Sequence, residues 1–201
     1  MDFASQDMTI GQLNAIVKKL GGEEGALRFL RGETVVVRRT PLDFKVWKSV
    51  KLGTGLGDIN TFSMALKFGK LRISDWARDM FTQPDFATAV EEVEVDLVNI
   101  AVEDLGLAKG AVYKDICIRA LEQGLQLCPP EVGPQLRLQY VHQPSEEWLR
   151  VAMKAIADSG GDLRIFAVGH GRGELWLDSV DGRPVSFYEP QHRFVFARRR
   201  A

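Results

Sequence analysis

The sequence predicts an α+β protein with a mainly helical N-terminal part, a short β element and a C-terminal antiparallel sheet covered by helices. Helical periodicity dominates residues 9–31, and strand-like alternation dominates the C-terminal third. The composition is that of a globular chain, with 45% apolar and 26% charged residues among 201. The best candidate for a domain boundary lies around Pro84, which divides the chain into 1–86 and 87–201, with a single domain as the alternative.

Two helices are expected at the start of the chain. Thr9 and Gln12 form a capping box, apolar residues then recur every three or four positions, and Gly21-Gly22 ends the first helix. A second, shorter helix begins near Glu23. Helix, glycine turn and helix are similar in outline to a DNA-binding helix-turn-helix, but helical hairpins of this kind are also common packing units.

Two strands and two capped helices are expected next. The β-branched residues 34–38 predict one strand, and residues 44–52 predict a second that runs into the glycine-rich stretch 53–57. Asp58 is the expected N-cap of the helix that follows, and Ser74 caps a shorter one.

The second half of the chain is expected to alternate between strands and helices. Acidic and apolar residues alternate over 92–102, which predicts a strand with one solvated face. We expect a helix over 111–123, a strand over 136–141, and a helix from Ser145 to the glycines at 160–161.

Short strands follow in the C-terminal third, at 163–168, 174–180, 185–188 and 194–197. The first two flank a glycine-rich hairpin tip, residues 169–173. Together with the strand over 136–141, they predict an antiparallel meander of four to five strands.

The net charge of −1 conceals a division along the chain. Residues 1–80 carry a net charge of +4, residues 81–190 carry −9, and the last eleven residues carry +4. Charge asymmetry of this kind indicates an interaction surface, although pairing of opposite faces within the molecule would also account for it.

The remaining composition excludes several classes of protein. Cys117 and Cys128 have no ligand-like spacing, and residues 1–7 lack the apolar core of a secretory signal, so we expect free thiols and a cytoplasmic location. The three histidines show no paired spacing, and we predict no metal site and no cofactor. No run approaches the roughly 18 apolar residues of a membrane span, so no membrane partner is expected.

Three stretches are similar to a family of uncharacterised bacterial proteins that is common in metagenomic and candidate-phylum genomes. They are MTIGQLNAIVKKLGGEEGALRFLRGE at 8–33, VWKSVKLGTGL at 46–56 and LCPPEVGPQLRLQY at 127–140. The resemblance covers nearly the whole chain from Met8, which implies that residues 1–7 are an extension or an alternative start. The family has no established function, so the resemblance implies no site residue.

The strongest candidate site is the glycine-rich stretch between the second strand and its helix. Glycines let the backbone approach a ligand, and free amides at a helix N-terminus attract phosphate or carboxylate. The predicted anion-binding residues are Gly53, Thr54, Gly55 and Gly57, with Lys51 adding positive charge. The G-x-G-x-G spacing departs from the dinucleotide fingerprint and from the P-loop, and a tight strand-to-helix connection would also account for the glycines.

Two further candidates carry titratable side chains. His170 and Arg172, at the hairpin tip, are predicted to bind a phosphate, or to act as an acid–base pair near Glu174. Glu131 lies in a proline- and glycine-rich loop, which suits a positioned carboxylate. A capping role, or an ion pair with Arg137, explains the same residue without catalysis.

No catalytic constellation emerges, so we assign no catalytic residue, and the sequence favours a protein that is not an enzyme. The first hypothesis is a non-catalytic interaction module that binds a protein or a nucleic-acid backbone through opposed charged surfaces. The alternative is a small enzyme acting on a phosphorylated or nucleotide-like ligand. It would hold the anion on the 53–57 loop and transfer protons through His170 or Glu131. A third possibility is a purely structural or self-assembling role. The partner and the oligomeric state do not follow from the sequence.

Overall fold

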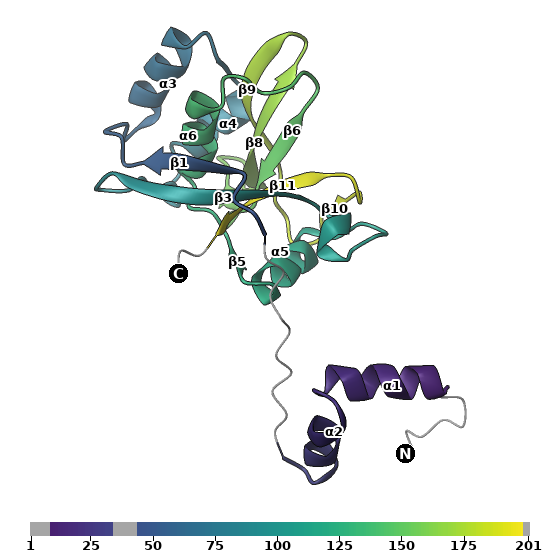
Figure 1. The fold of residues 1–201 in the computed structure, drawn as a ribbon. Helices are drawn as coiled ribbons and strands as arrows, with labels where there is room; N and C mark the ends of the chain where they lie inside the picture. Colours follow the sequence, from purple (N-terminus) through teal and green to yellow (C-terminus); the bar gives the residue numbers. More distant parts are fainter. Residues whose placement is uncertain (1–8, 34–43, 199–201) are drawn as a thin grey trace. The chain divides into compact units, whose positions relative to one another are not determined.

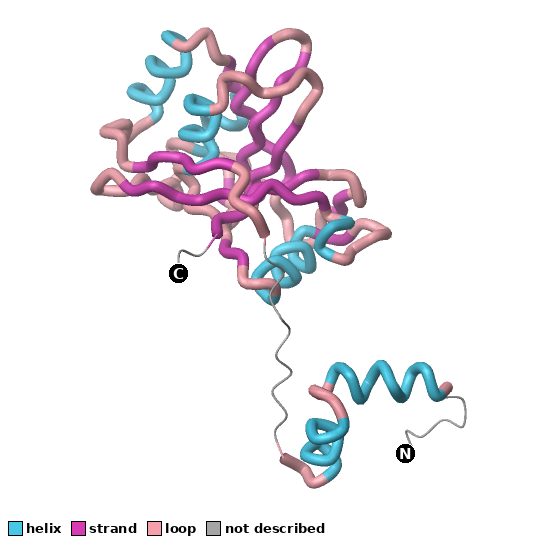
Figure 2. The backbone as a smooth tube through the Cα atoms, viewed as in Figure 1, coloured by secondary structure: helices cyan, strands magenta, loops and turns pink. Residues whose placement is uncertain are grey.

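A computed structural model of the chain describes residues 9–33 and 44–198 (Figures 1 and 2). The chain divides into two compact units, Met1–Thr40 and Pro41–Ala201. The stretch around Pro84 lies inside the second unit.

The first unit is a pair of short helices, α1 (Ile10–Lys19) and α2 (Glu23–Leu30). Both were predicted from the helical periodicity, and both are confirmed. The strand expected over 34–38 and the side chain of Gln12, on which the capping box depends, lie outside the described residues.

The second unit is built on a mixed nine-stranded sheet with the order β1-β3-β11-β6-β8-β9-β2 (Figure 1). Two short strands join this path, since β5 pairs with β11 and β7 with β8, and β10 and β4 form a separate two-stranded sheet. The bounds of the main strands are β1 (Lys48–Leu52), β2 (Arg72–Ile73), β3 (Val93–Ala101), β6 (Trp148–Val151), β8 (Leu163–Gly171), β9 (Glu174–Asp181) and β11 (Arg193–Arg198). The short ones are β4 (Ala111–Val112), β5 (Leu125–Gln126), β7 (Ile156–Ala157) and β10 (Phe187–Tyr188).

Four helices and one 3₁₀ turn connect these strands. They are α3 (Ile59–Phe68), α4 (Asp75–Met80), α5 (Tyr113–Glu122), α6 (Val132–Gln139) and the turn η1 (Glu103–Leu105). The α+β class is therefore confirmed. The predicted C-terminal meander is wrong, because strands from both halves of the chain interleave in one sheet and two of its pairings, β11 with β6 and β2 with β9, are parallel.

Local capping signals predicted helices correctly. Asp58 accepts a hydrogen bond from the Thr61 amide at 2.8 Å, and the Thr61 hydroxyl accepts one from the Asp58 amide at 3.2 Å, which completes a capping box on α3. Ser74 caps α4 by accepting from the Ala77 amide. The strand over 92–102 and the helix over 111–123 are confirmed as β3 and α5.

The strand predicted over 136–141 is wrong, because residues 136–139 form the end of helix α6 and Tyr140 is its C-cap. The alternation of Leu136, Leu138 and Tyr140 with polar residues matches the two-residue period of a strand. The buried side chains instead follow a helical step, since Val132 and Leu136 are four residues apart and both fully buried. Pro134 falls in the first turn of α6, where a missing backbone N–H is tolerated.

The helix predicted from Ser145 is also wrong, because strands β6 and β7 occupy this stretch. Glu146 has a φ of 62°, which is left-handed and breaks the expected first turn. In β6, Leu149 and Val151 are fully buried while Trp148 is half-buried, which is the two-residue period of a strand. Pairing with β8 and β11 on either side therefore overrides the local helical pattern.

The β8–β9 hairpin is confirmed, but its tip is shorter than expected. Gly171 pairs with Glu174, so the turn consists of Arg172 and Gly173, both with positive φ, as in type I′ turns. Gly169 lies within β8, where a Cβ would stand 2.3 Å from the Trp148 ring. This glycine lets the indole lie flat against the strand.

The core of the second unit contains a cluster of aromatic rings, formed by Phe62, Phe81, Phe86 and Phe166. It joins α3 and the end of α4 to strand β8, which fixes these helices on the sheet.

None of the helices in the described ranges combines the length and the apolar character of a membrane span.

Candidate functional site

The glycine-rich loop after β1 is closed by a buried carboxylate from the same chain. Glu131 is fully buried, and its Oε1 accepts a hydrogen bond from the Gly53 amide at 2.8 Å. Its Oε2 accepts one from the Ala89 amide at 2.7 Å. Gln135 donates to Glu131 Oε1 at 2.9 Å and to the Thr54 hydroxyl at 2.6 Å. An internal carboxylate thus takes the Gly53 amide that the sequence suggested for an external anion.

The structure also explains the glycine at position 53 and the position of Lys51. Gly53 has a φ of 67°, and a Cβ there would meet the Glu91 carbonyl oxygen at 2.1 Å, so only glycine fits. Lys51 pairs with Glu92 at 2.9 Å, and this hydrogen bond raises the pKa of the lysine. Gly55 and Gly57 have open space where a Cβ would stand. The structure therefore brings the loop and Glu131 together, while Lys51 has its own exposed partner.

In the described part of the chain, the hairpin candidates His170 and Arg172 form no hydrogen bond to the 53–57 loop or to Glu131. The His170 ring is half-buried, and its Nδ1 lies 2.7 Å from the Gln143 carbonyl oxygen, so the tautomer with hydrogen on Nδ1 donates there. Arg172 is exposed in the turn. Glu174, which was expected near His170, forms an ion pair with Arg72 of β2 at 2.8 Å.

Arg137 on α6 has partners other than Glu131. Its Nη1 donates to the Gln143 side-chain oxygen at 2.6 Å and to the Gly169 carbonyl at 3.1 Å, and its Nη2 donates to the Tyr140 carbonyl. The side chain is fully buried, and desolvation lowers the pKa of its guanidinium to about 10. This arginine therefore ties α6 to β8 by hydrogen bonds to neutral oxygens.

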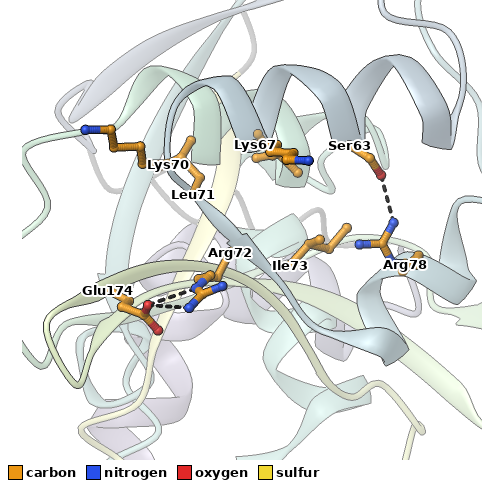
Figure 3. A pocket seen from close by; sticks show the side chains of 9 residues that line it. Ser63, Lys67, Lys70, Leu71, Arg72, Ile73, Arg78 and Glu174 are labelled. Atoms are coloured by element: carbon orange, nitrogen blue, oxygen red, sulfur yellow. Dashed lines mark hydrogen bonds and ion pairs between the residues drawn. The ribbon is translucent and has the colours of Figure 1, made fainter.

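A basic pocket that the sequence did not single out lies where α3, β2, α4 and β9 meet (Figure 3). Its volume is about 600 Å³. Four cationic side chains line it, together with one carboxylate, and the remaining lining residues are small or apolar. The lining residues are Ser63, Leu66, Lys67, Lys70, Leu71, Arg72, Ile73, Arg78 and Glu174.

The two arginines of the basic pocket are held in place by neighbours. Arg78 Nη1 donates to the Ser63 hydroxyl at 3.0 Å, and the two side chains point toward one another across the pocket (Figure 3). Arg72 donates to Glu174 Oε1 from Nε and Nη2, each at 2.8 Å. Among the described residues, Lys67 and Lys70 form no ion pair. The pocket thus combines two oriented guanidinium groups with two uncompensated ammonium groups.

Lys70 takes an unusual backbone conformation at the end of α3. The Leu71 amide donates to the Leu66 carbonyl at 2.8 Å and the Lys70 amide to the Lys67 carbonyl at 3.0 Å, which is the Schellman motif. Lys70 occupies the left-handed position of this motif with a φ of 55°, although glycine is the usual residue there. The preceding Gly69 has an ordinary φ of −74°.

Lys48 of β1 does not line the pocket and contacts aromatic rings instead. The ammonium of Lys48 lies over the rings of Trp47 and Tyr140, 5.9 and 5.0 Å from their centroids. The sequence shows a net positive charge before residue 80, in which the basic residues of 18–51 and 67–78 are candidates for one surface, but among the described residues only those of 67–78 line this pocket. The local sequence shows a pair of lysines three residues apart, Lys67 and Lys70. Nothing next to them indicates that Arg72 and Arg78 line the same pocket.

The cysteines and acidic residues suggest no second site. Cys117 is half-buried and Cys128 is buried, and desolvation raises the pKa of both thiols, that of Cys117 to about 11. In the described ranges 9–33 and 44–198, no three His, Cys, Asp or Glu side chains gather as a metal site would require.

No family model matches the chain, and neither the curated proteins nor the solved structures contain a match to it. The resemblance to a family of uncharacterised bacterial proteins therefore remains an expectation.

Proposed function

We propose that this protein is a non-catalytic interaction module that binds the phosphate backbone of a nucleic acid through the basic pocket. The observation that carries the proposal is that Lys67, Lys70, Arg72 and Arg78 all line one cavity whose lining contains a single carboxylate, that of Glu174. Four cations against one anion leave the pocket with net positive charge, which attracts a polyanion.

The arginines and lysines of the pocket both suit the binding of phosphate groups. Guanidinium groups offer a planar fork that matches two phosphate oxygens, and Arg72 and Arg78 already have their orientation set by Glu174 and Ser63. Lys67 and Lys70 are exposed, so their ammonium groups are free to follow a flexible backbone. The pocket therefore holds one phosphate, while the lysines extend its positive surface.

Two exposed apolar side chains of α3 favour single-stranded over double-stranded nucleic acid. Met64 is 74% exposed and Phe68 is 93% exposed, and the two lie one helical turn apart. Phe68 directly follows Lys67, which lines the pocket. Unpaired bases stack on exposed aromatic rings next to a basic groove, whereas bases in a duplex are already stacked on one another.

The pocket volume of about 600 Å³ also lies in the range of small-ligand sites, which supports the alternative of a phosphorylated small molecule. The two functions differ in a measurable way. A backbone-binding module binds an oligonucleotide much more tightly than a mononucleotide, whereas a small-ligand site binds both with similar affinity.

The first test is salt-dependent binding of a fluorescent single-stranded oligonucleotide, measured by anisotropy. We expect the double variant Lys67→Ala/Lys70→Ala to weaken binding about tenfold and to reduce the slope of log K against log salt by about 1–2. We expect Glu174→Gln to strengthen binding, because it removes the one negative charge of the pocket while the glutamine Oε1 can still accept a hydrogen bond from Arg72.

The matched control is Lys109→Ala/Lys114→Ala, which removes the same charge from two exposed lysines outside the pocket. It should leave the affinity within about twofold of the wild type, since distant exposed charges are screened. Binding that does not depend on salt, or an equal loss in this control, would reject the proposal. Equal affinity for a mononucleotide would support the small-ligand alternative.

Lys70 offers a test in which stability and binding change in opposite directions. The left-handed conformation is unfavourable for lysine, so Lys70→Gly is expected to raise the free energy of unfolding by about 0.5–1 kcal/mol. The same substitution removes an ammonium group from the pocket and should weaken oligonucleotide binding. Urea unfolding and anisotropy on the same samples measure both effects. Lys67→Ala is the comparison, because it should weaken binding without stabilising the fold.

A further inference from the structure

The N-terminal hairpin, residues 9–33, does not cover its own large apolar side chains. Ile10 and Leu30 are each 78% exposed, and four others are between 43% and 58% exposed: Leu13, Ile16, Leu27 and Phe29. Of the described residues in this unit, only Gly25 is buried. The hairpin as described therefore has no hydrophobic core of its own.

Helices this short need a partner surface to be stable. α1 has 10 residues and α2 has 8, whereas isolated helices below about 12–15 residues are marginal in water. Chains below about 40 residues usually fold only with disulfides, metals or oligomerisation. The two cysteines of this protein are Cys117 and Cys128, so no disulfide can close this unit. Its apolar stripe must therefore be covered by another surface.

The spacing of the stripe is that of a helical bundle seam. Ile10 and Leu13, which are exposed, and Val17 and Leu20, which are half-buried, follow one another at steps of three, four and three residues, the spacing of a and d positions in a heptad. Leu27 and Leu30 add a pair three residues apart on α2. This pattern packs best against other helices with the same spacing, as in four-helix bundles.

We propose that a second copy of the hairpin covers this stripe, forming a two-fold symmetric bundle in which the two α2 helices run antiparallel. The charges of α2 fit such a pairing. Glu23 and Glu24 begin the helix, Arg28 lies in its last turn and Arg31 follows it. In an antiparallel pair, the acidic end of each α2 meets the basic end of the other, so the surface is complementary to itself.

The ion pairs already present within the hairpin do not prevent Arg28 and Arg31 from pairing with a second copy. Arg28 and Arg31 contact Glu33 at 2.9 and 3.4 Å, and all three side chains are exposed. Exposed pairs of this kind contribute little to stability, so the arginines are free to turn toward the acidic residues of a second copy. Glu23 and Glu24 form no ion pair with any described residue.

Sedimentation equilibrium of the full chain tests the self-association. We expect a reversible monomer–dimer equilibrium up to roughly 100 µM, where a dimer with a micromolar Kd is largely formed. Leu13→Asp/Leu30→Asp should make the protein monomeric, and thermal unfolding of the second unit should be unchanged. A wild type that stays monomeric, or a variant that still dimerises, would overturn the proposal.

Disulfide trapping tests the antiparallel arrangement. A two-fold axis that crosses the middle of α2 brings Leu27 close to Leu27 of the second copy, while Ala15 lies on the side of α1 away from the stripe. Under mild oxidation, Leu27→Cys should form a covalent dimer well above the wild-type background, and Ala15→Cys should not. Equal trapping at both positions, or trapping at neither, would contradict this arrangement.

Discussion

Arg137→Met should lower the free energy of unfolding of the second unit by about 3–5 kcal/mol, one of the two largest effects we expect from a single substitution. The guanidinium donates to three oxygens, those of the Gln143 side chain and the Gly169 and Tyr140 carbonyls. Methionine fills most of the space but donates to none of them. Three acceptors in a buried region would then lose their partner.

Urea unfolding followed by tryptophan fluorescence measures this loss, with Arg183→Met as the control. Arg183 is exposed and pairs with Asp181, so its removal should change stability by less than about 1 kcal/mol. Arg137→Lys should fall between the wild type and Arg137→Met, because an ammonium group cannot reach all three oxygens in one plane. A value for Arg137→Met within 1 kcal/mol of the control would show that these hydrogen bonds do not hold α6 to β8.

Glu131→Ala should destabilise the second unit by about 3–4 kcal/mol. The carboxylate accepts from two backbone amides, those of Gly53 and Ala89, and from the Gln135 side chain. Alanine leaves the amides of these two half-buried residues without their acceptor. Glu131→Gln is the matched variant, because it keeps the shape and one acceptor oxygen, and it should lose about half as much.

Amide hydrogen exchange locates the effect of Glu131→Ala. We expect the Gly53 and Ala89 amides to lose protection first, because their acceptor is removed, while amides in β8 and β9 exchange only on global unfolding. Glu92→Gln is the control, since Glu92 forms only an exposed pair with Lys51. Unchanged protection at Gly53 and Ala89 would contradict the structural role of Glu131.

The features that were predictable from the sequence are those whose causes are local. Asp58 and Ser74 cap their helices through amides three residues further along the chain, so the signal and its result lie in the same short segment. The hairpin between β8 and β9 is equally local, because two alternating strands flank a glycine-containing turn.

The features that were not predictable depend on residues far apart in the chain. Glu131 was recognised as a positioned carboxylate, but its bond to Gly53 spans 78 residues and no local pattern indicates it. The stretch that forms β6 has helical periodicity, and only its place between β8 and β11 makes it a strand. The basic pocket combines side chains from three consecutive elements with Glu174, 102 residues beyond Arg72.

The position of β11 in the sheet has a consequence for the order in which the protein can fold as it is synthesised. β11 (Arg193–Arg198) is the last described strand in the chain, yet it lies between β3 and β6 near the middle of the sheet. Until these residues have left the ribosome, β3 and β6 each lack a neighbour, and their unpaired edges are exposed. The second unit should therefore fold only after translation has passed β11, and a chain that stops before Arg193 should aggregate.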